Sequence, residues 1–141
     1  MAEPQDQAVV LLSIHQQYAD AILAGEKRVE LRKTAFARDV SHVLLYVTSP
    51  LRRVVGYFEV ASIRKAAPSA LWRQYRRVSG VPKHHFDAYY GGCPEGIAIR
   101  IGAVRALGRQ VRLDEIGVRA PQSFAYVEAS VFETVRVLGL R

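Results

Sequence analysis

The sequence has 141 residues, half of them apolar, which is enough to bury the core of one ordinary domain. Twenty Lys and Arg against thirteen Asp and Glu leave a formal charge of +7, and this balance favours polyanionic partners such as nucleic acid over a merely basic surface. A single cysteine, Cys93, excludes an internal disulfide, no Cys or His spacing suits zinc, and no apolar run reaches the roughly 18 residues of a membrane span.

The N-terminal segment predicts a tail, a strand and a helix. Residues 1–7 are polar and indicate a disordered tail, so we expect a single domain over residues 8–141. The apolar run from Ala8 to Ile14 predicts a buried strand. Ser13 and Gln16 have the spacing of a capping box, which predicts that a helix follows at once.

Gly25 is typical of the residue that ends a helix, and an alternating segment follows it. In "RVELRK", Val29 and Leu31 share one face, whereas Arg28, Glu30 and Arg32 share the other. This alternation predicts a half-buried strand with a polar outer face, on which Glu30 and Arg32 are either a surface pair or part of a site.

The middle of the chain predicts two further strands. Residues 42–48 form an apolar run that ends at a Ser-Pro turn signal. Residues 53–65 are long enough for a bent strand, with Gly56 at a bulge or barrel corner. Glu59 shares its face of this strand with Val55, Tyr57 and other largely apolar residues, so we expect a buried carboxylate there.

The second half predicts short helices and a central strand. Leu71 and Tyr75 are spaced as on a helix, and Pro82 opens a second helical segment. Residues 95–107 alternate with isoleucines inward, which predicts a central strand. Residues 120–138 have a helical rhythm, although their β-branched content leaves a terminal strand possible.

Strands outnumber helices in this pattern, and the helices lie between strands. The fold class is therefore predicted as α+β, a small mixed β-barrel with short peripheral helices. An open parallel α/β sheet is the alternative. The composition and the lone cysteine favour a cytoplasmic protein.

Four segments follow one another along the chain: "LLSIHQQYADAILAGEKRVELRK", "VVGYFEV", "EGIAIRIG" and "PQSFAYV". In these segments and in their order, the chain resembles the ASCH-domain proteins of the PUA-like superfamily. It implies a PUA-like barrel and RNA or other nucleic-acid binding. Some members resemble ribonucleases, and one branch hydrolyses acetylated cytidine. Where that branch has a threonine hydroxyl, three residues after its lysine, this chain has Glu30, which counts against that amidohydrolase activity.

A basic cleft between the helices and the barrel mouth is the predicted binding site. Its nucleic-acid-binding candidates are Lys27, Glu30, Arg32, Arg52, Arg53, Arg76 and Tyr18. Guanidinium groups pair with phosphate, and aromatic rings stack on bases. No metal site and no cofactor are predicted, and RNA is the expected partner. Tyr46 and Trp72 are instead expected in the core.

The catalytic candidates are Lys27, Glu59 and Ser123. Lys27 is either a solvated loop lysine or a site group, and Glu59 is either paired with a base such as Lys27 or Arg32 or is itself an acid or base. Ser123 is either a site hydroxyl or a helix N-cap, and the cap is favoured. Two hypotheses result: a domain that binds single-stranded RNA or a modified nucleotide, and a metal-independent ribonuclease or modified-nucleoside hydrolase using the same cleft. A module that acts through protein partners is a third.

Overall fold

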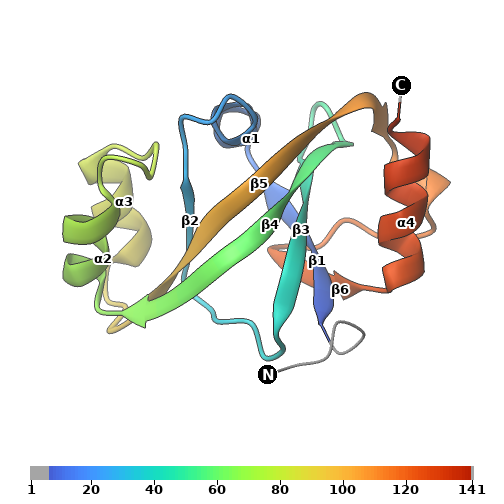
Figure 1. The fold of residues 1–141 in the computed structure, drawn as a ribbon. Helices are drawn as coiled ribbons and strands as arrows, with labels where there is room; N and C mark the ends of the chain where they lie inside the picture. Colours follow the sequence, from blue (N-terminus) through green and yellow to red (C-terminus); the bar gives the residue numbers. More distant parts are fainter. Residues whose placement is uncertain (1–6, 141) are drawn as a thin grey trace.

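The computed structural model describes residues 7–140 and has a curled, mixed sheet at its centre (Figure 1). The predicted tail, apart from Gln7, therefore lies outside the described residues. The strands are β1 (Ala8–Ile14), β2 (Val29–Arg32), β3 (Val40–Val47), β4 (Arg53–Ala66), β5 (Gly96–Val111) and β6 (Phe124–Val127). They form one six-stranded sheet in the order β2-β5-β4-β3-β1-β6. The β1–β3 pair is parallel and the other pairs are antiparallel. The predicted α+β class is confirmed.

Four helices surround the sheet. They are α1 (Gln16–Leu23), α2 (Pro68–Tyr75), α3 (Lys83–Tyr90) and α4 (Ala129–Leu138), with a short 3₁₀ turn at Leu113–Glu115. Figure 1 shows α2 and α3 together on one side of the sheet, α4 on the other side and α1 across one end. Within the described residues, no helix has both the length and the hydrophobicity that a membrane crossing needs.

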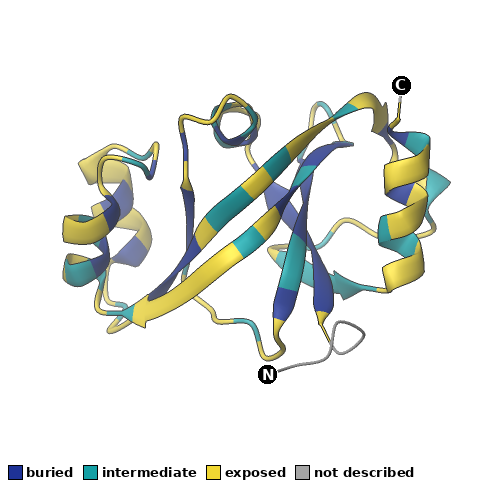
Figure 2. Cartoon of the chain, in the orientation of Figure 1, coloured by how far each residue is buried: buried dark blue, intermediate teal, exposed yellow. Residues whose placement is uncertain are grey.

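Strand β1 is the most deeply buried element, and every one of its residues is buried (Figure 2). Val10 and Leu12 pack into the core on the α1 side, whereas Val9 and Leu11 pack toward Val135 of α4. Alternate side chains of a strand point to opposite faces, so a strand that is covered on both faces is expected to be apolar at nearly every position. This position explains the apolar run, which only Ser13 interrupts.

Helices α2 and α3 form a lobe with its own small core. Leu71 and Tyr75 of α2, spaced as predicted, pack with Phe86 and Tyr90 of α3 against Val29 and Leu31 of β2. Trp72 lies at the edge of this cluster, and Tyr46 is buried in the core beneath α4. The core position predicted for Tyr46 is thus confirmed, whereas Trp72 is only partly buried.

Two glycine predictions are confirmed. Gly25 follows the end of α1 with φ of +80°, the left-handed conformation that glycine adopts without strain. Gly56 lies beside register shifts in the pairing of β4 with both β3 and β5, which marks a β-bulge.

One local prediction is wrong. Ser13 does not cap α1, because it is still part of β1 and its hydroxyl donates to the carbonyl of Pro121 at 2.6 Å. The N-cap of α1 is His15. For residues 120–138, both alternatives apply to different parts of the segment, since Phe124–Val127 form β6 beside β1 and Ala129–Leu138 are helical.

Candidate functional site

A pocket of about 310 Å³ opens where the end of β1, the start of α1, β2 and α3 meet. Its polar and charged lining residues are Ser13, His15, Lys27, Glu30, Arg32, Thr48 and His85. Its aromatic lining residues are Tyr18, Phe86, Tyr89 and Tyr90, and Ile14, Leu31 and Val81 complete the wall. The pocket thus combines apolar ring faces with a small number of charged groups, as ligand sites usually do.

A buried charge network forms the inner wall of the pocket. Glu30 lies between two bases, with Lys27 Nζ 3.4 Å from Oε1 and Arg32 Nη2 2.8 Å from Oε2. The side chains of Lys27 and Glu30 are only 1% and 7% exposed. Lys27 also donates to the carbonyl oxygen of Ser79 in the α2–α3 loop. Each buried charge therefore has a partner, and the three groups together retain one net positive charge.

Arg32 connects three segments of the chain at this pocket. Its Nε donates to Glu30 at 2.8 Å, its Nη2 donates to the carbonyl of Ser13 at 2.9 Å, and its Nη1 donates to Ser123 Oγ at 3.3 Å. Strand β2 and strand β6 are the two edges of the sheet. The Arg32 guanidinium thus links the end of β2 to Ser123, the residue that precedes β6.

The local sequence explains why this network is buried. After Gly25 ends α1, the amide of Lys27 donates back to the carbonyl of Ala21 at 3.1 Å, which holds the lysine beneath the helix. Tyr18 covers Lys27 on the α1 side, with the ammonium 5.2 Å from the ring centroid. On the other side, Gly80 packs against the Lys27 stem. The lysine thus lies between α1 and the α2–α3 loop.

Burial changes the acid–base behaviour of three pocket groups. Desolvation lowers the pKa of Lys27 from its ordinary value of 10.5, although the nearby Glu30 carboxylate partly opposes the shift. Desolvation also raises the pKa of Tyr89 and, more strongly, that of Tyr90. Tyr90 donates its hydroxyl to the carbonyl of Arg32 at 3.0 Å. Both phenols therefore remain protonated around neutral pH.

The lowered pKa of Lys27 predicts a pH dependence of stability. Between the folded-state pKa and 10.5, the unfolded chain binds more protons at Lys27 than the folded chain, so stability rises with pH in this window. We expect wild type to gain stability relative to Lys27→Met when the pH is raised from about 7 to about 10. Unfolding of both proteins in guanidinium chloride measures the difference between their free energies of unfolding at each pH. The contribution of Tyr90 cancels in this difference, because both proteins contain it. A difference that stays constant or shrinks would contradict the shift.

The structure brings four of the predicted site residues together. Tyr18, Lys27, Glu30 and Arg32 all line the pocket. Lys27 is neither a solvated loop residue nor an exposed phosphate contact, because its ammonium is committed to Glu30 and Ser79. Glu30 and Arg32 are paired in the pocket wall, with side chains 7% and 16% exposed, so the alternative of a solvated surface pair is excluded. These three charged side chains form part of the pocket wall and hold one another in place.

Glu59 lies elsewhere, and the expectation that it is buried is wrong. Its side chain is 59% exposed and approaches the imidazole of His42, with Oε1 3.9 Å from Nε2. Neither Lys27 nor Arg32 pairs with it. The apolar face that it shares is itself uncovered farther along β4, where Ile63 is 41% exposed.

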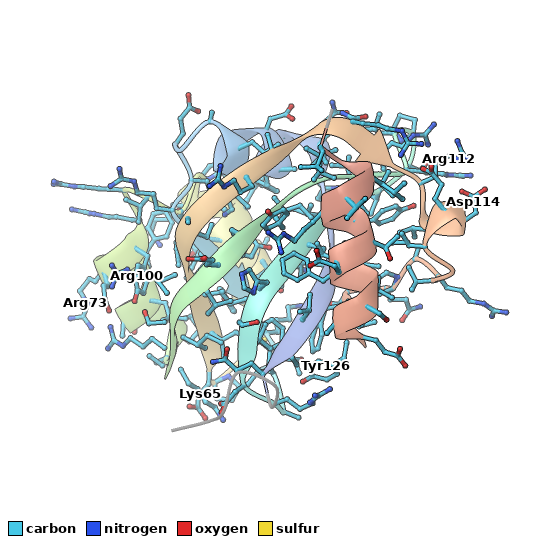
Figure 3. All side chains as sticks on the ribbon, turned by 45° about the vertical axis from the view of Figure 1, so that its right-hand side comes forward. Lys65, Arg73, Arg100, Arg112, Asp114 and Tyr126 are labelled. Atoms are coloured by element: carbon cyan, nitrogen blue, oxygen red, sulfur yellow. The ribbon has the colours of Figure 1, made fainter. Side chains whose placement is uncertain are left out.

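Arg52, Arg53 and Arg76 do not line the pocket either. Arg53 donates to the carbonyls of its neighbours Leu51 and Arg52. Basic side chains are not confined to the pocket: in Figure 3, Arg112 lies at the upper right, whereas Arg73, Arg100 and Lys65 lie at the left and lower left. The pocket therefore contains fewer basic residues than the sequence suggested. Lys27 and Arg32 are the Lys and Arg side chains of its wall.

Ser123 is exposed beside the pocket, where its hydroxyl accepts from Arg32. It does not cap a helix, because it precedes β6 and α4 begins at Ala129. Of the two interpretations of this serine, the favoured cap is therefore wrong, and a hydroxyl at the edge of the site is the one compatible with its position.

The sequence reasoning missed His15, His85, Tyr89 and Thr48 as pocket residues. His85 lies in α3 and is exposed at the edge of the pocket. His15 directly follows β1 and starts α1. His15 could have been predicted as a site residue, because it is a polar residue directly after a buried strand. Within the described residues, no group of three or more His, Cys, Asp and Glu side chains could hold a metal ion.

The fold and the pocket together define a small PUA-like protein with a basic, aromatic-lined site. The ASCH domain model matches residues 12–129. The chain therefore belongs to the ASCH domain family, as the ordered segments predicted.

Three comparisons describe what the chain is similar to. An ASCH domain-containing ribonuclease of Zymomonas mobilis is 25% identical over 146 residues, covering 99% of this chain and 97% of that protein. The large ribosomal subunit protein uL22 of Ureaplasma parvum is 30% identical over 128 residues, covering 89% of this chain. The matched region spans only 41% of the length of that ribosomal protein. The crystal structure of ASCH from Zymomonas mobilis has a TM-score of 0.85 at 22% identity, covering 92% of this chain and 94% of that one, and shows the shared fold.

Proposed function

We propose that this protein is a ribonuclease that binds single-stranded RNA with one unpaired nucleotide in the pocket of Tyr18, Lys27, Glu30 and Arg32. The carrying observation is that pocket, which joins aromatic faces to a fixed charge network. The similarity to a protein named as a ribonuclease, over nearly the full length of both chains, supports turnover in addition to binding. The charge of +7 favours a polyanionic substrate.

The dimensions of the pocket favour one nucleotide over a duplex. A volume of about 310 Å³ is at the small end of ligand sites. A base can enter it only when it is unpaired and turned away from its neighbours, which is the usual state of RNA bases that proteins read. The Glu30 carboxylate can accept from an exocyclic amino group, and the ring of Tyr18 offers a face for stacking.

At the edge of the pocket, a second aromatic–cation pair can receive the adjoining nucleotide. Lys33, which directly follows β2, places its ammonium 4.7 Å from the ring centroid of Tyr89. Both residues are exposed. A base stacked on Tyr89 would lie beside this positive charge, which suits the alternation of bases and phosphates along a single strand.

Binding without turnover is the second candidate function. The observation that favours it is the commitment of the Lys27, Glu30 and Arg32 side chains to one another, which leaves none of them free as a nucleophile. Glu30 also carries no hydroxyl at the position where the acetylcytidine-hydrolysing branch has one, so we do not propose that reaction.

Turnover of a labelled oligoribonucleotide separates the two candidates. We expect the wild-type protein to shorten single-stranded RNA, assayed once with Mg²⁺ and once with EDTA, and to leave the matching DNA intact. RNA that stays intact under both conditions, while still being bound, would refute the ribonuclease and leave the binding function. RNA that is neither bound nor cut at low salt would refute both.

The position of the bound nucleotide is tested by substitution of Tyr18. We expect Tyr18→Ala to raise the Kd for single-stranded RNA about tenfold, because a stacked base contributes about 1–3 kcal/mol. Tyr18→Phe keeps the ring and should bind like wild type, and Gln17→Ala alters the exposed neighbour on the same helix. Fluorescence anisotropy measures all three. Equal affinities for Tyr18→Ala and Tyr18→Phe would show that the base does not enter this pocket.

A further inference from the structure

Two imidazoles from different elements line the same pocket. His15 is the N-cap of α1 and makes no capping hydrogen bond with its side chain, and His85 lies in the first turn of α3. Both residues are exposed. The two helices are separated in sequence by three strands, so the fold itself brings these side chains to one site.

The other titratable groups that line the pocket are poorly suited to moving protons. The Lys27 ammonium is held by Glu30 and Ser79, and the Glu30 carboxylate is held by Lys27 and Arg32. Burial raises the pKa of Tyr89 and Tyr90, which keeps both phenols protonated. By contrast, histidine is the side chain type that most readily both accepts and donates a proton near neutral pH.

We propose that His15 and His85 are the general base and general acid of RNA cleavage in this pocket, and that the reaction uses the substrate's own 2′-hydroxyl as nucleophile. This inference rests on the proposed ribonuclease function. It specifies the substrate as a ribose-containing strand and the product as a cyclic phosphate.

The reaction balances without any further reactant. One neutral imidazole takes the proton of the 2′-hydroxyl, and the 2′-oxygen forms a bond to the adjacent phosphorus. The bond from phosphorus to the 5′-oxygen of the next nucleotide breaks, and the second, protonated imidazole donates its proton to that oxygen. The products are a 2′,3′-cyclic phosphate and a free 5′-hydroxyl. The two imidazoles end with their protonation states exchanged, and solvent restores them.

The basic side of the pocket assists this chemistry. Negative charge on the non-bridging phosphate oxygens increases as the 2′-oxygen attacks. The Lys27–Glu30–Arg32 network carries one net positive charge and is held rigidly by its hydrogen bonds. Ser123 Oγ, which accepts from Arg32, retains a hydroxyl proton that can be donated to such an oxygen.

The first test compares RNA cleavage by three histidine variants. His15→Ala and His85→Ala should each lower kcat on single-stranded RNA by about a hundredfold to ten-thousandfold, with little change in the Kd for RNA. His84→Ala is the matched control, because His84 adjoins His85 with ring centroids 4.3 Å apart but does not line the pocket. It should cleave like wild type. Free imidazole added to the solution should partly restore the two slow variants, which a merely structural role would not allow.

The substrate and the product provide further evidence. A strand with a single 2′-deoxynucleotide before the scissile bond should resist cleavage there, and mass spectrometry should find the cyclic phosphate. A bridging 5′-phosphorothiolate, whose sulfur leaves without being protonated, should restore the rate of the variant that lacks the acid and of that variant alone. Full activity of His15→Ala or His85→Ala, a product with a 3′-hydroxyl, or cleavage at the deoxynucleotide would overturn the inference while leaving a ribonuclease. Absence of any RNA cleavage by wild type would overturn both.

Discussion

Glu30→Ala should lower the free energy of unfolding by about 3–5 kcal/mol, which is the usual effect of removing one partner from a buried charge network. The substitution leaves the Lys27 ammonium, only 1% exposed, with the Ser79 carbonyl but without its carboxylate. It also removes the acceptor of the Arg32 Nε hydrogen bond at 2.8 Å. Two bases of like charge would then remain close together in the pocket wall.

The matched control is Glu59→Ala, which removes the same side chain from an exposed position on β4. Because the Glu59 side chain is 59% exposed and only approaches His42, its loss should change stability by no more than about 0.5 kcal/mol. Chemical denaturation of wild type and both variants measures the two differences. Similar values for Glu30→Ala and Glu59→Ala would show that the network contributes little to stability.

Glu30 also shows where the strand pattern was informative and where it failed. The alternation in "RVELRK" correctly located β2 and the buried side chains Val29 and Leu31. It left open whether Glu30 is a solvated surface group or part of a site, because alternation distinguishes two faces but does not reveal what covers each of them. Here the α2–α3 lobe covers one face and the pocket occupies the other, and the lobe is formed by the later residues 68–90.

The prediction that Glu59 is buried was wrong for a related reason. An apolar row beside a carboxylate predicts burial only if another layer packs on that row. Strand β3 pairs with β4 only as far as Glu59, so the second half of β4 has β5 as its sole strand partner. Residues 61–65 are all exposed as a result. Single-sequence reasoning found the strand but could not determine how far its neighbours extend.

The ordered segments that predicted the ASCH family performed better than the individual side chains. The first of them contains Tyr18, Lys27 and Arg32, which line one pocket, because the strand, helix and glycine that hold them follow one another directly in the sequence. His85 comes from the distant α3 and Ser123 from the segment before β6, and only the fold brings these residues near β2. A sequence pattern predicts the parts of a site that are close together in the chain. Parts that come from distant segments are found only from the structure.

Gly56→Ala is expected to destabilise the protein by up to about 3 kcal/mol, at the upper end of what overpacking usually costs. A Cβ at this position would lie 2.6 Å from the carbonyl oxygen of Arg105 and 2.7 Å from Cδ2 of Leu23. The first of these atoms belongs to the backbone of β5, which pairs with β4 here, so it cannot withdraw without loss of strand pairing. The second belongs to the last residue of α1.

This clash couples the barrel to the candidate site, because α1 also carries Tyr18 into the pocket. Displacement of Leu23 should move the helix, so Gly56→Ala should weaken RNA binding as well as lower stability. Gly91→Ala is the matched control: its Cβ would meet its nearest neighbour, the carbonyl oxygen of Asp87, at 3.4 Å, and its φ of −49° suits any residue. Unfolding curves and RNA anisotropy on both variants measure the coupling. A Gly56→Ala protein that lost stability but bound RNA like wild type would show that the position of α1 does not depend on this contact, and that the pocket wall is held by Lys27 and its partners instead.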